Sequence, residues 1–118
     1  MVIRDRLGAM ALSGLLQRYR IDPAVVDRVI LGTVLGEPRT TNLAREAALA
    51  CRPPQPCPAF TVTGACPPSD VAIQTGVVAI ARGAADVVID GGAVALSHAP
   101  PPLRRARLTT PLQAQRAR

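Results

Sequence analysis

The chain has 118 residues, a hydrophobic share of 48% and a formal net charge of +6. This length fits one domain, which can bury about two-thirds of the surface of its unfolded chain. Every basic residue is an arginine, and the charge gathers near the two ends without interleaved aromatic residues. Composition therefore does not indicate nucleic-acid recognition.

The three cysteines and the single histidine predict neither a zinc site nor a redox dithiol. Cys51, Cys57 and Cys66 form no Cys-x-x-Cys pair, and His98 lies far along the chain. We therefore expect no metal. The sequence has no 18-residue apolar run and no secretory signal, so we expect a protein of the reducing cytosol that has no membrane-spanning segment.

The first third of the chain predicts two helices and a strand. Residues 5–20 carry apolar side chains at three- and four-residue spacing, which is typical of an amphipathic helix. The predicted packing face contains Leu7, Ala11, Leu12, Leu15, Leu16 and Tyr19. Asp22 and Pro23 predict a short helix, because Asp is a good N-cap and Pro suits the first helical position. The apolar run 28–35 then predicts a strand.

The middle of the chain predicts a helix, a break and a second strand. The helix begins at residues 41–42 and ends near Cys51. Prolines exclude both helix and central strand from 52–58, since they lack the backbone donors that either would need. The β-branched run 59–63 predicts a strand.

The last third predicts a buried helix and a further strand. Residues 69–82 are apolar nearly all round, which predicts a helix buried on every side, and Gly83 provides its C-terminal stop. Residues 86–90 predict a strand in the middle of a sheet. Covering these elements takes more material than the chain holds. We therefore expect residues 1–102 to be a partial domain and 103–118 an arginine-rich tail.

Cys66 falls at the turn between the strand 59–63 and the helix 69–82. The positive end of a helix stabilises a thiolate, and a thiol at this place can act as a nucleophile. Most free cysteines are buried small apolar residues, and that alternative stays open on the residues alone.

Four segments resemble, in order and spacing, the N-terminal half of thiolases. They are 26–35, 41–49, 58–66 and 81–100, and their closest likeness is to 3-ketoacyl-CoA thiolases (acetyl-CoA acyltransferases) of the trifunctional-complex β-subunit type. The resemblance implies an α/β fold with helices packed on a mixed β-sheet. It also implies an acyltransferase of fatty-acid β-oxidation in which Cys66 carries the acyl group.

The resemblance implies CoA thioesters as substrates and no separate cofactor, and it assigns no cofactor-binding residue. It also implies homo- or hetero-oligomers with thiolase-type subunits. Several positions depart from the family pattern: Thr63 replaces Asn, Pro67 and Pro68 replace small residues, Val94 replaces Glu, and Leu96 replaces Met. The family's catalytic histidine and second cysteine belong to motifs beyond residue 118. His98 matches a variable position, so we interpret it as a loop histidine.

Three hypotheses follow from these observations. The first is an incomplete thiolase-type acyltransferase that is weak or inactive alone. The second is an inactive remnant or interaction module that docks on a full-length thiolase. The third, which depends on the arginine-rich tail alone, is a small nucleic-acid binder. Because its central helix and strand lack packing partners, we expect the isolated chain to be poorly soluble, oligomeric or molten.

Overall fold

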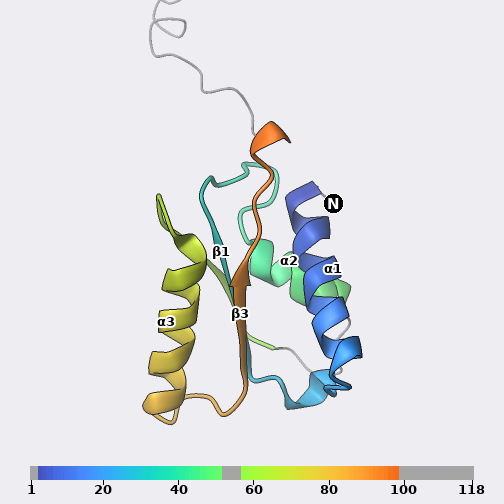
Figure 1. Cartoon of the computed structure of the whole chain (residues 1–118), viewed down its shortest axis with the longest axis vertical. Coiled ribbons are helices and arrows are strands. Elements are labelled where there is room, and N and C mark those ends of the chain that lie inside the picture. The colour runs from blue at the N-terminus through green and yellow to red at the C-terminus, as the bar shows by residue number, and fades with distance from the viewer. Residues whose placement is uncertain (1–2, 52–56, 99–118) are drawn as a thin grey trace, which may run out of the picture.

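Three short strands form one parallel sheet in the computed structural model, which describes residues 3–51 and 57–98. The described elements follow one another as α1 (Ile3–Arg18), a 3-10 turn (Pro23–Val25), β1 (Arg28–Thr33), α2 (Leu43–Ala50), β2 (Ala59–Thr63), α3 (Pro68–Ala81), β3 (Val88–Gly92) and a second 3-10 turn (Leu96–His98). Figure 1 shows the sheet edge-on, with α3 on one side and α1 and α2 on the other. The α/β prediction is confirmed, while the predicted tail 103–118 lies outside the described residues.

The strand order is β2-β1-β3, so β1 is the central strand. Ile30 pairs with Phe60 and with Asp90, and all the pairings are parallel. The sheet is thus parallel in the described residues, where a mixed sheet was expected. The prediction that the last strand lies in the middle of the sheet is wrong: β3 lies at the edge of the three strands, and β1 takes the buried central position.

One face of the sheet packs on α2, and α1 covers α2 in turn. Val29, Leu31 and Ile89 from the sheet meet Leu12 and Leu43 from the helices in one apolar core. Gly8 allows the close approach of the helices, since a Cβ there would lie 3.1 Å from Leu43 Cδ1.

The predicted packing face of α1 is only partly correct. Leu12 and Leu16 are buried as predicted, but Leu7, Leu15 and Tyr19 are exposed. The buried stripe instead follows Asp5, Gly8, Ala9, Leu12 and Leu16. A contact through Gly8 and Ala9 brings the backbones together, and this rotates the larger leucines on the neighbouring stripe toward solvent.

A buried ion pair joins the start of α1 to the loop after β1. Arg4 donates to Asp5 Oδ1 at 3.2 Å, to the Leu35 carbonyl oxygen at 3.1 Å and to the Thr40 carbonyl oxygen at 2.6 Å. Both side chains are almost fully buried. Charges in an interior need partners. The Arg4 guanidinium provides one for Asp5 Oδ1 and holds the 35–40 loop against the helix, whereas Asp5 Oδ2 has no hydrogen-bond partner among the described residues.

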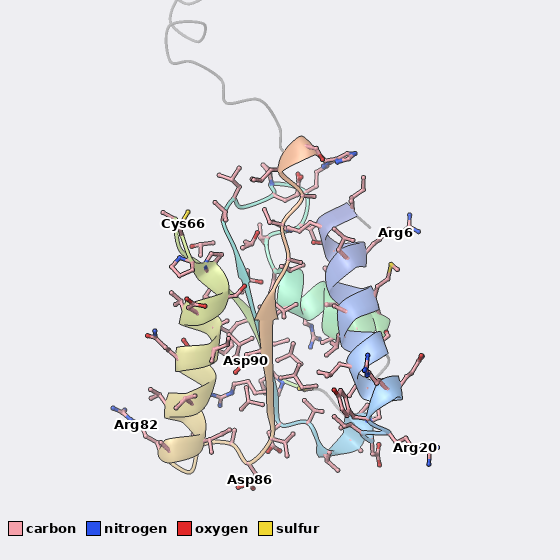
Figure 2. The ribbon with its side chains drawn as sticks, in the orientation of Figure 1. Arg6, Arg20, Cys66, Arg82, Asp86 and Asp90 are labelled. Atoms are coloured by element: carbon pink, nitrogen blue, oxygen red, sulfur yellow. The ribbon has the colours of Figure 1, made fainter. Side chains whose placement is uncertain are left out.

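The other face of the sheet carries α3, which contacts it through small residues. Ala72, Gly76 and Ala79 are its buried residues. A Cβ on Gly76 would collide with the Asp90 carboxylate, which Figure 2 shows between α3 and β3. The helix and the sheet therefore pack closely along the stripe of Ala72, Gly76 and Ala79.

The outer side of α3 is exposed and apolar within the described chain. This agrees with the expectation that a helix whose pattern predicts burial on every side lacks packing partners in this chain. Its exposed residues are Val71, Ile73, Val77, Val78 and Ile80, and Val77 is 60% exposed. The predicted end of this helix is confirmed: Gly83 has a φ of 67°, and its N–H donates to the Ile80 carbonyl oxygen. That left-handed conformation is easy for glycine and costly for other residues.

Candidate active site

Cys66 lies exposed at the elbow between β2 and α3, at the carboxyl end of the parallel strands. Figure 2 shows it at the end of α3 opposite to Arg82. The strand ends at Thr63 and the helix begins at Pro68, so the predicted elbow is confirmed. An exposed thiol at this place is accessible to a substrate. Its catalytic role stays a prediction.

The start of α3 offers few backbone donors because two prolines stand there. Pro67 is the N-cap and Pro68 is the first helical residue, and neither has an N–H. The Val71 N–H donates to the Pro67 carbonyl oxygen at 3.4 Å. The N–H groups of Ser69 and Asp70 are therefore the first-turn donors that can face an anion, together with the N–H of Cys66 itself.

A negative charge in the first turn of α3 further weakens the stabilisation of an anion at this end of the helix. Asp70 is an exposed acidic residue in the first turn of α3. Its carboxylate lies near the positive end of the helix and competes with a thiolate or an oxyanion for that end. A helix start with every backbone donor free and no acidic side chain would stabilise negative charge more than this one.

A hydrogen-bond network holds β2, the strand that leads into Cys66. Asn42 Nδ2 donates to the Ala59 carbonyl oxygen at 3.0 Å, and the Thr61 hydroxyl donates to Asn42 Oδ1 at 2.9 Å. The Thr61 hydroxyl also accepts from the Ala44 N–H at 3.1 Å. The start of α2 thus holds β2 at Ala59 and Thr61, in the strand that leads to the elbow.

The other two cysteines have structural surroundings. Cys57 is buried, and burial is the main reason that its pKa is raised, with a further contribution from the negative charge of Asp27. Cys51 Sγ lies 3.2 Å from Ser13 Oγ, on the side of α1. Both thiols line an apolar pocket whose other walls are Leu12, Leu16, Pro23, Val26, Val29, Ala48 and Ile89.

Three of the residues that depart from the thiolase pattern lie at the surface. Thr63, Val94 and Leu96 are all exposed. His98 is exposed too, and its Nδ1 pairs with the Ser97 hydroxyl at 3.0 Å. Among the hydrogen bonds of residues 3–51 and 57–98, none joins Cys66 to a base. The structure therefore does not bring His98 and Cys66 together.

Two further questions concern metals and membranes. Within the described ranges, no group of three or more His, Cys, Asp or Glu side chains is placed to hold a metal ion. None of the helices seen in the same ranges has the length and hydropathy needed to cross a bilayer.

Sequence reasoning missed the groups that position the elbow. Asn42 was recognised only as a helix start, although its side chain also binds β2. The close contacts of two sheet glycines, Gly32 and Gly92, with the first turn of α3 were not predicted either. The sole signal in the sequence was that Gly32 and Gly92 interrupt otherwise strand-like runs, which marks a close approach of another backbone.

The comparisons with known proteins agree with this geometry. The family described as "Thiolase, N-terminal domain" matches residues 2–117. The β subunit of the mitochondrial trifunctional enzyme of Mus musculus is 49% identical over 94 residues, which are 80% of this chain and 20% of that protein. A steroid 3-ketoacyl-CoA thiolase of Mycobacterium tuberculosis is 45% identical over 96 residues, 80% of this chain and 23% of that protein.

A solved structure shows the same likeness in three dimensions. The crystal structure of the Bacillus anthracis acetyl-CoA acetyltransferase superposes with a TM-score of 0.80 at 32% sequence identity. The match covers 90% of this chain and 27% of that one. The chain thus spans about a fifth to a quarter of the length of the relatives that it matches.

Proposed function

The chain belongs to the thiolase N-terminal domain family, and from this premise we propose that it is a thiolase-type acyltransferase polypeptide whose nucleophile is Cys66. The observation that supports this most directly is the exposed thiol at a strand-to-helix elbow, in a chain whose relatives are thiolases. The proposed substrates are 3-ketoacyl-CoA thioesters and CoA, with no separate cofactor.

The proposed reaction forms and breaks one carbon–sulfur bond at Cys66. The thiolate attacks the 3-keto carbon of the substrate, and the bond between C2 and C3 breaks. The acyl group stays on sulfur, while acetyl-CoA leaves as its enolate and takes up a proton. A second CoA then loses its thiol proton and attacks the acyl-cysteine, so that acyl-CoA leaves and the Cys66 thiolate returns. The proton that this CoA releases balances the one that the enolate takes up.

The chain by itself supplies only part of this chemistry. The described residues place no base in hydrogen-bond contact with Cys66, and a positioned base contributes about 10²–10⁴-fold in rate. The family resemblance assigns that base and the proton-moving cysteine to a part of the thiolase chain that these 118 residues do not include. We therefore expect slow single acylation of Cys66 and little turnover.

A thiolase-type subunit is the proposed partner. The exposed apolar side of α3 supports an assembly in which another polypeptide covers it. The alternative function, an inactive module that docks on a full-length thiolase, has the support of this same surface. Cytosolic location stays a prediction, while the trifunctional β subunits that the chain resembles are named as mitochondrial.

Mass spectrometry after incubation with acetoacetyl-CoA tests the proposal. We expect an added acetyl group on the peptide that contains Cys66, and none in a Cys66→Ser variant. Cys51→Ser is the matched control, because it removes a thiol away from the elbow and should keep the adduct. Equal, background acetylation in the wild-type protein and in Cys66→Ser would reject the enzyme in favour of the docking module.

A further inference from the structure

The first turn of α3 packs against two glycines that lie side by side on neighbouring strands. Gly32 of β1 and Gly92 of β3 are directly paired in the parallel register, and the Ala93 N–H beside them donates to the Gly32 carbonyl oxygen at 3.1 Å. Paired residues of neighbouring strands present their side-chain positions to the same face of a sheet. Here that face is the one on which α3 lies.

The space that a side chain would need at these two positions is filled by α3. A Cβ on Gly32 would collide with the carbonyl group of Pro68 and would lie 2.9 Å from the Ser69 nitrogen. A Cβ on Gly92 would collide with the Ser69 hydroxyl and would lie 2.8 Å from the Gly32 carbonyl oxygen. The atoms facing Gly32 belong to the backbone, which cannot rotate away as a side chain can.

The connection from this contact to Cys66 is short. Only Pro67, with a φ of −115° and a ψ of 113°, separates Pro68 from Cys66. The few backbone torsions between Cys66 and the helix must therefore take up any shift of the first turn. A displacement of Pro68 from the sheet thus changes this connection, and with it the relation of the Cys66 sulfur to the first-turn N–H groups.

We propose that Gly32 and Gly92 are positioning residues that set the reactivity of the Cys66 thiol by seating the first turn of α3 on the sheet. The proposal rests on the proposed function for the role of the Cys66 thiol as a nucleophile. The geometry of the seat does not depend on it. Neither glycine touches a substrate, and each acts through the helix that starts behind Cys66.

Alkylation of the 118-residue chain by iodoacetamide tests this seat. The rate constant at Cys66 is measured by peptide mapping as a function of pH, and labelling of the buried Cys57 reports in the same sample whether the fold is intact. The test variants are Gly32→Ala and Gly92→Ala. Gly36→Ala and Gly14→Ala are matched controls, because a Cβ at either position meets nothing within 4 Å.

We expect Gly32→Ala to lower the rate constant of Cys66 alkylation by more than about twofold, because it displaces the first turn of α3 from the sheet. Cys57 should stay protected. Gly92→Ala should have the same effect. Adding Ser69→Ala to the Gly92→Ala protein should restore part of the rate, because it removes the Ser69 hydroxyl, one of the two groups that a Cβ on Gly92 would meet. Both controls should match the wild-type protein.

Two outcomes would overturn the proposal. One is a Gly32→Ala protein in which Cys57 stays protected and the rate constant of Cys66 alkylation stays within twofold of the wild-type value at every pH. The other is rapid labelling of Cys57 in both alanine variants, since the glycines would then serve the whole fold. Because alkylation uses no acyl-CoA, a protein that is never acylated yet responds to Gly32→Ala refutes the proposed function and leaves the seat standing.

Discussion

Asp27 joins two segments of the chain that lie far apart in sequence. Its Oδ2 accepts from the Val87 N–H at 2.9 Å and from the Asp86 N–H at 2.8 Å. Its own N–H donates to the Val87 carbonyl oxygen at 2.9 Å. These bonds hold the start of β3 beside the start of β1, at the end of the sheet away from Cys66; Figure 2 shows Asp86 at that end.

The Asp27 bonds predict a loss of stability in acid. The N–H groups of Val87 and then of Asp86 lower the pKa of this carboxyl below its ordinary value. The stabilisation is therefore complete above the unfolded-state pKa, near 4, and is lost as pH falls through the lower folded-state pKa. Thermal melts between pH 2 and 6 should show a smaller acid-induced drop in Tm for Asp27→Asn than for wild type. Parallel curves for the two proteins would contradict this.

Single residues were predictable from the sequence when their role is local. Cys66 was placed correctly because a β-branched strand and two prolines bracket it, and Gly83 because glycine commonly ends a helix. The bonds of Asp27 and the seat at Gly32 were not predictable. Their partners come from 36 to 60 positions farther along the chain, and no pattern within one element reports such a contact.

At the scale of elements, α2 and β2 depend on Asn42. Its Oδ1 caps α2 by accepting from the Arg45 N–H at 3.1 Å, and its Nδ2 pairs the Ala59 carbonyl oxygen of β2. One side chain thus serves both the start of a helix and the strand beside it.

Replacing Asn42 should loosen both elements. We expect Asn42→Ala to lower the free energy of unfolding by about 1–2 kcal/mol, since it removes a helix cap and leaves a strand carbonyl without its donor. Asn42→Asp keeps the capping acceptor and should lose less. Urea denaturation followed by circular dichroism measures the difference. The explanation fails if the Ala and Asp variants are equally destabilised.

Element boundaries were predicted to within about two residues, whereas element environments were not. The helix predicted over 5–20 is Ile3–Arg18, and the one over 69–82 is Pro68–Ala81. Caps and prolines act locally, which explains this success. The packing stripe of α1 was missed, because it depends on which other elements are present and on how closely small residues let them approach. The open side of α3 was expected from the length of the chain, and its small buried stripe was not.

At the scale of the whole molecule, the apolar outer side of α3 predicts self-association. Val77 lies on this side with 60% of its surface exposed. Val77→Lys should reduce the concentration-dependent light scattering of the purified chain. Gln74→Lys adds the same charge to an exposed position of the same helix without removing an apolar side chain, so it should help less. Equal improvement from both variants would assign the effect to charge alone.

The parallel register also has a consequence for the newly made chain on the ribosome. Residue 29 pairs with residues 59 and 89, so no strand meets its neighbour through a tight hairpin. The apolar stretch Val29-Ile30-Leu31 must emerge and stay without a strand partner while at least 30 further residues are translated. A holdase chaperone that binds this stretch should raise the yield of soluble protein and leave the stability of the finished fold unchanged.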